Sequence, residues 1–391
     1  MNILLISHYY LNQNYGGTEV LTGAVANYLQ SRGHKIYWIA SGSHLPILSS
    51  KYYLCPITPP SHSRFDIDLF EEEQSAKIER LLQEIHISFD IVYVSHYVTS
   101  GLFFIDSPWL QSAKKVLTLT DYSLICPNCV FYSFHKRKIC TTNANCSDCG
   151  YPLDMSKYLQ KYLSFINEKF HLITFQTQTQ RHIFMSFGVS AQKILDYSGA
   201  YPVFLDWKFA PIARDSTSLQ MYFIGRGSPE KGLNVIASSM QYVAYGNVDL
   251  HVYSYPDEDT TYWNQFLHLV KSNQNFYYDG VIEYAKLDMI FNRADCIVIP
   301  SQWLENYPTI MSYALAWDCP LIISGVPSLK EFSSENTIII EDYANPEAWG
   351  RIISNYYDIL KRKKRNNLIA NSNQLFHKLM QRMFFYDTFM E

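Results

Sequence analysis

The stretch QMYFIGRGSPEKGLNVIASSMQY (residues 220–242) has the pattern of a strand, a glycine-containing loop and a helix. Gln220–Ile224 is a short, mainly apolar run that favours a buried strand, and Leu233–Tyr242 has helical spacing. A strand that runs through a tight loop into a helix is half of a βαβ unit. The pattern therefore predicts a parallel sheet covered by helices on both faces.

The loop in this stretch carries two cations, Arg226 and Lys231, five positions apart. Arginine can bind phosphate through a bidentate fork, and lysine adds a mobile point charge. Gly225 and Gly227 would let the backbone come close to a ligand. The loop suits a diphosphate, although taken alone it fits an ordinary loop with two solvated basic residues equally well.

The same alternation of apolar runs and amphipathic segments continues along nearly the whole chain. It predicts an α/β protein with two Rossmann-like domains, for which 391 residues suffice. We expect an N-terminal domain over residues 1–200, a linker over 201–219 and a C-terminal domain over 220–391. Such sheets bind ligands beyond the carboxyl ends of their strands, so a substrate is expected in a cleft between the domains. The predicted strands span residues 2–7, 35–40, 91–94, 116–119, 171–175, 220–224, 249–253, 275–278, 296–299, 320–323 and 337–340.

A second candidate site is PSQWLENYP (residues 300–308), which follows an apolar run. Pro308 marks a helix start, and free N–H groups at a helix start can bind an anion. Glu305 would face the same pocket and accept hydrogen bonds from sugar hydroxyls. The alternative is that Glu305 only offsets the helix dipole.

A third candidate lies near the amino terminus, in HYYLNQNYGGTEV (residues 8–20). Gly16 and Gly17 give a flexible approach to a helix that Thr18 could cap. Backbone N–H groups there could meet a phosphate or an acceptor. The motif is not GxGxxG, which argues against a nicotinamide or flavin dehydrogenase.

Composition and charge exclude several classes of protein. The net charge of −4 gives no overall attraction for nucleic acid. No apolar run reaches the ~18 residues of a membrane span, and no secretory leader is recognisable, so we expect a cytoplasmic protein. The basic run 361–365 could contact anionic lipid at the inner face of the membrane, although a cationic helix end explains it more simply.

The four segments GG (16–17), GRGSPEKG (225–232), PSQWLENYP (300–308) and SGVPSLKEF (324–332) occur in the order seen in glycosyltransferase family 4. The chain resembles this family over about residues 1–360. The segment after TDY (120–122) is similar to that of a bacterial subgroup with a cysteine-rich insertion, here residues 122–153. The resemblance implies a GT-B fold, a nucleotide-diphosphate-sugar donor, retention at the anomeric carbon and no catalytic metal.

The resemblance also implies roles for single residues. Arg226 and Lys231 would stabilise the diphosphate leaving group, whose charge grows in the transition state, and Glu305 would hold donor-sugar hydroxyls, which makes these three the predicted catalytic residues. His96 and Asp121 are expected on the acceptor side, with a structural histidine an equally good interpretation of His96. The predicted donor-binding residues are Gly16, Gly17, Gly225, Asn306, Tyr307, Thr309, Tyr313 and Glu331.

The chain departs from the family pattern at several of these positions. Tyr313 stands where the family has a second glutamate that bonds the ribose, and Thr120 stands where the related subgroup has histidine. Asp318 replaces a usual glycine, and Pro327-Ser328 replace a common Gly-Gly. These departures weaken the expectation of ordinary catalysis more than that of the fold.

Five of the eight cysteines fall within the insertion, with the spacing C-x2-C-x10-C-x5-C-x2-C. Two C-x-x-C pairs are enough for a tetrahedral thiolate site. The subgroup suggests Cys126, Cys140, Cys146 and Cys149 as ligands, with Cys129 as an alternate. A structural zinc site is the first interpretation, and an iron-sulfur cluster or a redox dithiol is the alternative.

We therefore expect a retaining, hexosyltransferase-type glycosyltransferase of polysaccharide biosynthesis that acts on a glycan, lipid-linked or small-molecule acceptor. Thr120 and Tyr313 favour the alternative, a catalytically impaired GT-B protein that assists another glycosyltransferase. A redox or hydrolytic protein built on the cysteines is the weakest interpretation, because it leaves GRGSPEKG and WLENYP unexplained.

Overall fold

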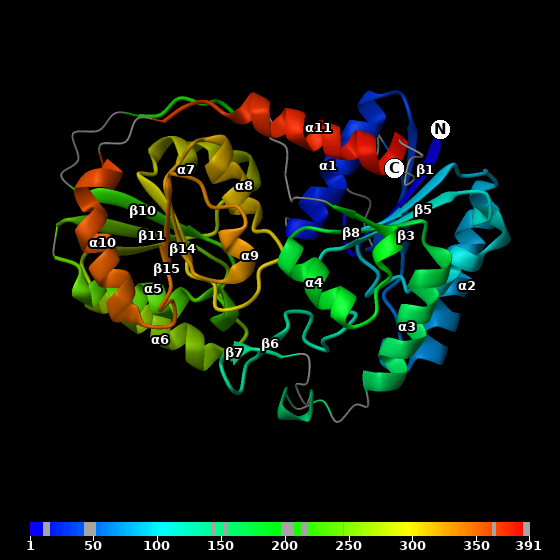
Figure 1. The fold of residues 1–391 in the computed structure, drawn as a ribbon, viewed down its shortest axis with the longest axis horizontal. Coiled ribbons are helices and arrows are strands. Elements are labelled where there is room, and N and C mark those ends of the chain that lie inside the picture. The colour runs from blue at the N-terminus through cyan, green and yellow to red at the C-terminus, as the bar shows by residue number, and fades with distance from the viewer. Residues whose placement is uncertain are drawn as a thin grey trace. The chain divides into compact units, whose positions relative to one another are not determined.

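The computed structural model describes residues 1–10, 16–42, 52–141, 146–149, 151, 155–196, 207–212, 218–244, 246–361 and 365–385 (Figure 1). The chain divides into two compact units. The first unit comprises Met1–Cys129, Gly150–Tyr201 and Gln374–Glu391, and the second comprises Val130–Cys149 and Pro202–Asn373.

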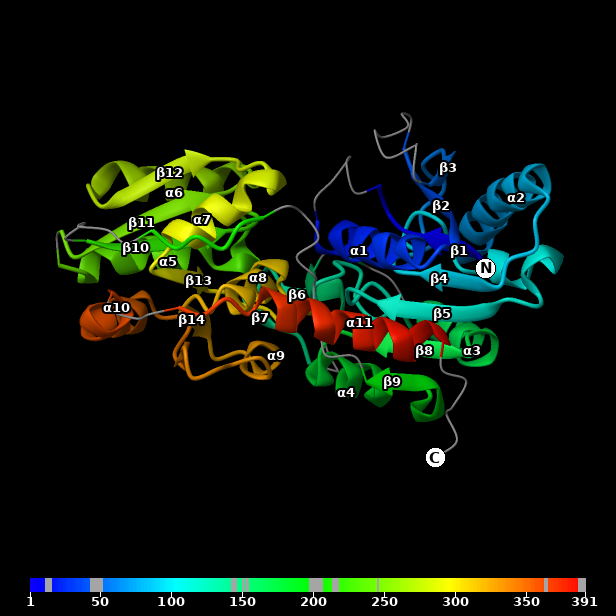
Figure 2. The same cartoon turned by 90° about the horizontal axis from the view of Figure 1, so that it is seen from above.

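The first unit is built on a parallel sheet with the order β3-β2-β1-β4-β5-β8-β9 (Figure 2). Its strands are β1 (Asn2–Ile6), β2 (Lys35–Ser41), β3 (Tyr53–Ile57), β4 (Ile91–Val94), β5 (Lys114–Leu119), β8 (Leu172–Phe175) and β9 (Ile194–Asp196). Its α-helices are α1 (Gly17–Ser31), α2 (Ile67–Ile85), α3 (Met155–Lys169), α4 (Gln178–Ser186) and most of α11 (Ile369–Phe385). Ile3 to Ile6 are fully buried, as expected of a parallel strand covered on both faces.

The second unit has a parallel sheet with the order β12-β11-β10-β13-β14-β15. Its strands are β10 (Leu219–Ile224), β11 (Val248–Tyr253), β12 (Phe276–Gly280), β13 (Cys296–Ile299), β14 (Leu321–Ser324) and β15 (Thr337–Ile340). Its α-helices are α5 (Leu233–Ser239), α6 (Thr260–Ser272), α7 (Leu287–Arg293), α8 (Thr309–Ala316), α9 (Pro327–Lys330) and α10 (Pro346–Lys361). A short antiparallel hairpin, β6 (Tyr132–Ser133) and β7 (Lys138–Ile139), also belongs to this unit.

A large cluster of buried residues lies on one face of the sheet of the second unit. Met221 and Phe223 of β10 point to this face and pack with Phe266 of α6 and Trp349 of α10. Tyr222, between them, points to the opposite face, where it lies near Ile290 of α7. This alternation of side chains along β10 is what the two-sided sheet predicted from residues 220–242 requires.

Each sheet has one topological switch point, where the strand order reverses. In the first unit the chain adds β2 and β3 on one side of β1 and β4 and β5 on the other. In the second unit β11 and β12 lie on one side of β10, and β13 and β14 lie on the other. Ligands of open parallel sheets bind at the carboxyl ends of the strands beside such a point.

The fold predicted from the sequence is confirmed, with two corrections to its boundaries. Residues from Gln374 onward belong to the first unit rather than the second, because Phe376 packs on Tyr28 of α1 with ring centroids 6.1 Å apart. Residues 130–149 of the insertion belong to the second unit. There, burial and the charge of Glu230 raise the pKa of Tyr132 to about 12.

Sequence patterns missed some elements, and some of the predicted segments fall on residues outside the described part. Strands β3 and β9, at the two edges of the first sheet, were not predicted. Much of the predicted linker, residues 201–206 and 213–217, lies outside the described residues, as does most of the basic run 361–365. Trp207, also placed in the linker, packs within the second unit.

Candidate donor and acceptor sites

The loop after β10 is locked onto the loop after β13. Gly232 has a φ of 73°, and a Cβ added to it would lie 1.9 Å from the carbonyl oxygen of Pro300. The backbone N–H of Gln302 donates to the carbonyl of Glu230 at 2.7 Å. Only glycine fits this close approach, which fixes Lys231 next to the segment that carries Glu305.

Lys231 and Glu305 form a nearly buried ion pair. The Lys231 Nζ lies 2.7 Å and 2.9 Å from the two carboxylate oxygens of Glu305. The hydroxyl of Ser301 donates to the same carboxylate, and Nζ lies 5.0 Å from the ring centroid of Trp303. The side chain of Glu305 is only 4% exposed, and these partners offset the cost of burying a carboxylate.

Arg226 forms the second ion pair of the loop. Its Nη2 lies 2.9 Å from Oε1 of Glu230, which also accepts a hydrogen bond of 2.6 Å from the Ser228 hydroxyl. The Glu230 side chain is 3% exposed, whereas that of Arg226 is 62% exposed. A buried carboxylate therefore anchors a guanidinium that remains open to a ligand, as a phosphate-binding arginine requires.

The predicted donor-binding residues after β13 lie in the same loop. Asn306 and Tyr307 are buried, and Tyr307 packs edge-on against Phe332 at 4.3 Å. Thr309 is half-buried and is the first residue of α8, after Pro308 at the N-cap. Their backbone thus lies at a helix start, the arrangement predicted from PSQWLENYP.

Gly225 and Glu331 occupy different parts of the second unit. The N–H of Gly225 donates to the carbonyl of Tyr253, the last residue of β11, at 3.2 Å. Glu331 is exposed at the carboxyl end of α9. Gly225 directly follows β10, whereas Glu331 follows α9.

Tyr313 is fully buried in an aromatic cluster. Its ring lies 4.8 Å from Trp207 and 6.1 Å from Phe291, and its hydroxyl is hydrogen-bonded to that of Tyr284. The hydroxyl that was expected to contact a donor ribose is thus bonded within the second unit, where the ring of Tyr313 contributes to packing.

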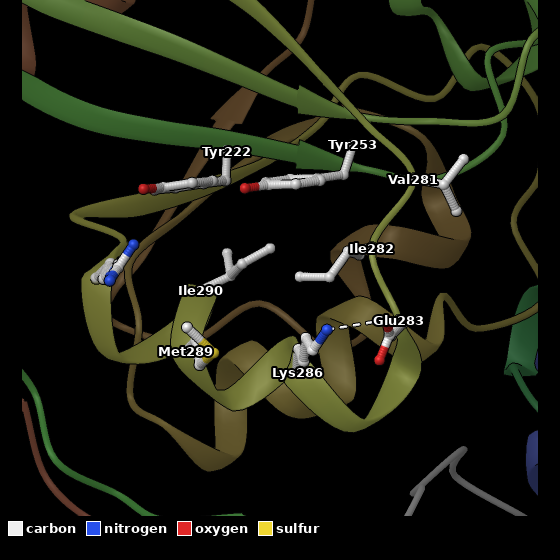
Figure 3. Close-up of a pocket in the computed structure, with 9 residues that line it drawn as sticks. Tyr222, Tyr253, Val281, Ile282, Glu283, Lys286, Met289 and Ile290 are labelled. Carbon is white, nitrogen blue, oxygen red and sulfur yellow. Dashed lines mark hydrogen bonds and ion pairs between the residues drawn. The ribbon is translucent and has the colours of Figure 1, made fainter.

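A pocket of about 250 Å³ lies between the sheet of the second unit and α7 (Figure 3). The rings of Tyr222 and Tyr253 form one wall, nearly parallel, opposite Ile282 and Ile290. Glu283 and Lys286, joined at 2.8 Å, lie at its edge. Because Tyr253 is bonded through its backbone to Gly225, this pocket adjoins the loop that carries Arg226.

The predicted acceptor residues meet in the first unit. His96 follows β4, Asp121 follows β5, and His96 Nε2 lies 3.0 Å from Asp121 Oδ2. Burial opposes ionisation of Asp121, but the charge of His96 and hydrogen bonds from His96 and Ser123 outweigh it and lower the pKa of Asp121. Asp121 is therefore a carboxylate at neutral pH that orients the imidazole.

The helix start beside these residues differs from the prediction. Gly16 is the N-cap and Gly17 the first residue of α1, so Thr18 is not the cap. Instead the Thr18 hydroxyl donates to that of Thr120 at 3.1 Å, and Thr120 donates to the carbonyl of Ser95 at 2.9 Å. Thr120 therefore ties α1 to the ends of β4 and β5.

Sequence patterns missed His8, Glu230 and Ser301. His8 follows β1, and its ring stacks on His96 with centroids 5.0 Å apart. Glu230 lies between the two cations of the predicted phosphate loop and had no predicted role. His8 and Ser301 could have been found from their positions, because each is a polar residue just after a strand that borders a switch point.

The cysteines are divided between the units. Cys126 and Cys129 belong to the first unit, while Cys140, Cys146 and Cys149 belong to the second. Among the described residues, no three His, Cys, Asp or Glu side chains are grouped closely enough to hold a metal. Burial raises the pKa of Cys129 to about 12, and its sulfur accepts a hydrogen bond of 3.4 Å from Arg64. The structural zinc site therefore stays a prediction.

Comparison with known proteins finds a family model that is similar to much of the second unit. Residues 207–375 match the family model described as glycosyl transferases group 1. Nearly all of the matched residues lie in the second unit, and they include the Arg226–Glu230 and Lys231–Glu305 ion pairs.

Over the whole chain, the sequence is 23% identical over 381 residues to an uncharacterized 42.6 kDa protein in the cps region of Klebsiella pneumoniae. The alignment covers 88% of this chain and 90% of the other.

Solved structures share the fold at low sequence identity. Anabaena HepE in complex with UDP and glucose has a TM-score of 0.66 and 13% identity, covering 98% of this chain and 95% of that one. WaaG, a glycosyltransferase involved in lipopolysaccharide biosynthesis, has a TM-score of 0.65 and 12% identity, covering 98% and 100%. The catalytic domain of starch synthase IV from Arabidopsis thaliana gives 0.60 and 12%, covering 97% and 94%. The fold is therefore GT-B. Within the described residues, no helix is long and apolar enough to cross a bilayer.

Proposed function

We propose that this protein is a glycosyltransferase that moves a hexosyl group from a nucleotide-diphosphate sugar to an acceptor hydroxyl, with retention at the anomeric carbon. The observation that carries the proposal is the pairing of Lys231 with Glu305 and of Arg226 with Glu230 at one switch point. The match of residues 207–375 to the group 1 family supports it.

Arg226 and Lys231 act on the leaving group. The exposed guanidinium of Arg226 can form a fork with two phosphate oxygens, while Glu230 holds it in place. Lys231 adds a second positive charge. Because its surroundings are little exposed to water, this charge acts more strongly on the phosphates. As the bond to the sugar breaks, negative charge grows on the diphosphate, and both cations stabilise that charge.

Glu305 binds the sugar of the donor. Its carboxylate already accepts hydrogen bonds from Lys231 and Ser301, and a carboxylate has lone pairs left for a sugar hydroxyl. Sugar and diphosphate would then be held on the two sides of one ion pair. This shared anchoring favours an active enzyme over the impaired assembly partner.

The nucleotide base would lie against the pocket of Tyr222 and Tyr253. Two parallel phenol rings offer a planar base an aromatic surface, and the pocket adjoins the loop of Arg226. HepE has been solved with UDP and with UDP-glucose, so UDP-glucose is the first donor to test. The ribose is not assigned to Tyr313, because Tyr284 already bonds its hydroxyl.

The acceptor would be a glycan, a lipid-linked sugar or a small molecule bound by the first unit. The relative in the cps region of Klebsiella pneumoniae supports a role in polysaccharide biosynthesis. We propose that the protein works in the cytoplasm at the inner face of the membrane, and that any metal bound by the cysteines is structural.

The test is incubation of the full-length protein with UDP-glucose, UDP-galactose, GDP-mannose and ADP-glucose. We expect release of free nucleotide from at least one donor, and an α-configured product by NMR. The double variant Lys231→Met/Glu305→Gln serves as control and should lose turnover. Absence of both nucleotide release and nucleotide binding for all four donors would overturn the proposal.

A further inference from the structure

His8 lies at the switch point of the first unit. It follows β1, and His96 follows β4, the two strands between which the strand order reverses. Asp121 follows β5, the next strand along. The carboxyl ends of three adjacent parallel strands thus bring two imidazoles and a carboxylate to the place where such sheets bind ligands.

These three side chains are linked in sequence by a hydrogen bond and a ring stack. Asp121 Oδ2 is bonded to His96 Nε2 at 3.0 Å, and Asp121 Oδ1 accepts the N–H of Ser123 at 2.8 Å. The rings of His96 and His8 are 5.0 Å apart and inclined by only 9°. Asp121 therefore fixes His96, and His96 fixes the plane of His8.

The ring of His8 keeps its hydrogen-bonding capacity open. Within the described part of the chain, neither of its nitrogens has a hydrogen-bond partner, and the residue is half-buried rather than enclosed. Burial, helped by the charge of His96, lowers the pKa of His8 to about 4. At neutral pH the ring is therefore uncharged, with one N–H donor and one acceptor nitrogen.

Four hydroxyl groups at this edge already bond one another in pairs. Thr22 and Ser95 bond each other at 2.6 Å, and Thr18 bonds Thr120 at 3.1 Å. Glu19 is buried, and burial raises its pKa. The ring of His8 differs from these groups because it is only partly buried and has no hydrogen-bond partner among the described residues.

The charges at this edge favour a neutral polar ligand over an anion. Asp121 is a carboxylate that faces His96, burial raises the pKa of Glu19, and the guanidinium of Arg64 already donates to the carbonyl of Pro127 at 2.6 Å and to the sulfur of Cys129. A group that both donates and accepts one hydrogen bond matches a neutral imidazole. A hydroxyl is such a group.

We propose that His8 binds the hydroxyl of the acceptor, a sugar or another polyol, at the switch point of the first unit, and that His96 and Asp121 position its ring. The proposal rests on the glycosyltransferase function proposed above. It adds a residue that neither the sequence patterns nor the comparisons assign, and it gives the His96–Asp121 pair a task that does not require proton transfer.

The experiment compares His8→Ala, His8→Phe and His8→Gln with the unmodified full-length protein. Phenylalanine keeps a ring for stacking on His96 but cannot bind a hydroxyl, whereas glutamine keeps a donor and an acceptor. Transfer from UDP-glucose, or from whichever donor the wild type uses, is measured to p-nitrophenyl glycosides of glucose, galactose and N-acetylglucosamine. Affinity for UDP and thermal unfolding are measured in parallel.

We expect a three- to tenfold loss of acceptor kcat/KM in His8→Ala and His8→Phe, the scale of one neutral hydrogen bond. His8→Gln should stay within about twofold of the wild type, and the affinity for UDP should not change in any variant. Where no glycoside is used, the same criterion applies to donor hydrolysis, since water then takes the acceptor's place.

Two results would overturn the assignment of His8 while leaving the proposed function intact. One is wild-type acceptor kcat/KM in His8→Phe, and the other is an equal loss in all three variants together with lowered thermal stability. A wild-type protein that turns over no nucleotide sugar would instead overturn the proposed function, and the role of His8 with it.

Discussion

The two switch points have the same topology but opposite electrostatic character. In the second unit, two cations after β10 meet buried carboxylates, one of which, Glu305, follows β13. In the first unit, His8 and His96 follow β1 and β4, and Asp121 pairs with the imidazole of His96 rather than with a lysine or arginine. A diphosphate leaving group needs positive charge, whereas an acceptor hydroxyl needs a neutral partner. One sheet topology can therefore supply both environments.

Removing a charge at the switch point of the second unit should have the largest effect on both activity and stability. Lys231→Met should lower kcat about 10²- to 10³-fold, because the lysine stabilises charge that appears in the transition state. It should also destabilise the fold by about 2–4 kcal/mol, since Glu305 is left buried without its cation. Donor turnover and urea unfolding measure the two effects.

A double variant separates these effects. Lys231→Met/Glu305→Gln removes both charges, so stability should largely return while turnover stays lost. Arg351→Met, which breaks an exposed pair with Glu347 on α10, is the control. It should leave turnover unchanged and alter the free energy of unfolding by no more than about 1 kcal/mol. Recovery of turnover in the double variant would show that Lys231 serves only to neutralise Glu305.

The second prediction concerns the backbone contact that aligns Lys231 with Glu305. Gly232→Ala should destabilise the protein by about 3 kcal/mol or more, because the new Cβ meets the Pro300 carbonyl and the φ of 73° disfavours alanine. Gly246→Ala is the matched control, since Gly246 has a φ of 81° with open space around it. It should cost about 1 kcal/mol. Equal Tm shifts in the two variants would contradict the close approach.

The third prediction tests whether Tyr313 belongs to packing or to the donor site. Tyr313→Phe should cost about 1 kcal/mol for the lost bond to Tyr284 and leave affinity for UDP unchanged. Tyr313→Glu should cost at least about 3 kcal/mol, because it buries a carboxylate among Trp207, Phe291 and Trp317. A tenfold weaker affinity for UDP in Tyr313→Phe would instead support the ribose contact expected from the sequence.

The sequence predicted the core of both sheets because buried parallel strands leave a continuous apolar run. Strands such as β1 and β13 are found within a residue of their expected bounds. The edge strand β3 was missed because its residues are only partly buried, and Pro56 interrupts its pattern. The place of α11 was missed because its contact with Tyr28 joins residues far apart in sequence.

The site was predictable where charge and loop position coincide. Arg226, Lys231 and Glu305 follow strands and carry charges, so the pattern singled them out as candidates, and the structure pairs Lys231 with Glu305. Asp318 shows the limit of such patterns. Where the family has glycine, it adopts a φ of 48° and binds Asn366 through its side chain, so one residue takes both the backbone role and a tertiary contact.

The last prediction uses pH to test the neutral character of the first switch point. The folded protein keeps His8 neutral down to about pH 4, whereas the unfolded chain protonates it near pH 6.5. Between these values the unfolded state binds more protons, so the free energy of unfolding falls as the pH falls. His8→Gln removes this contribution and should lessen the loss of stability between pH 7.5 and pH 5 by about 1–2 kcal/mol, after allowance for the partial exposure of the ring.

Urea unfolding at the two pH values measures this difference, and His268→Gln on the exposed face of α6 is the control with the same substitution. The control should follow the wild type. If His8→Gln also follows the wild type, His8 is charged alike in the folded and unfolded chain. The first switch point would then carry a cation at low pH, and its contrast with the second unit would reduce to geometry rather than charge.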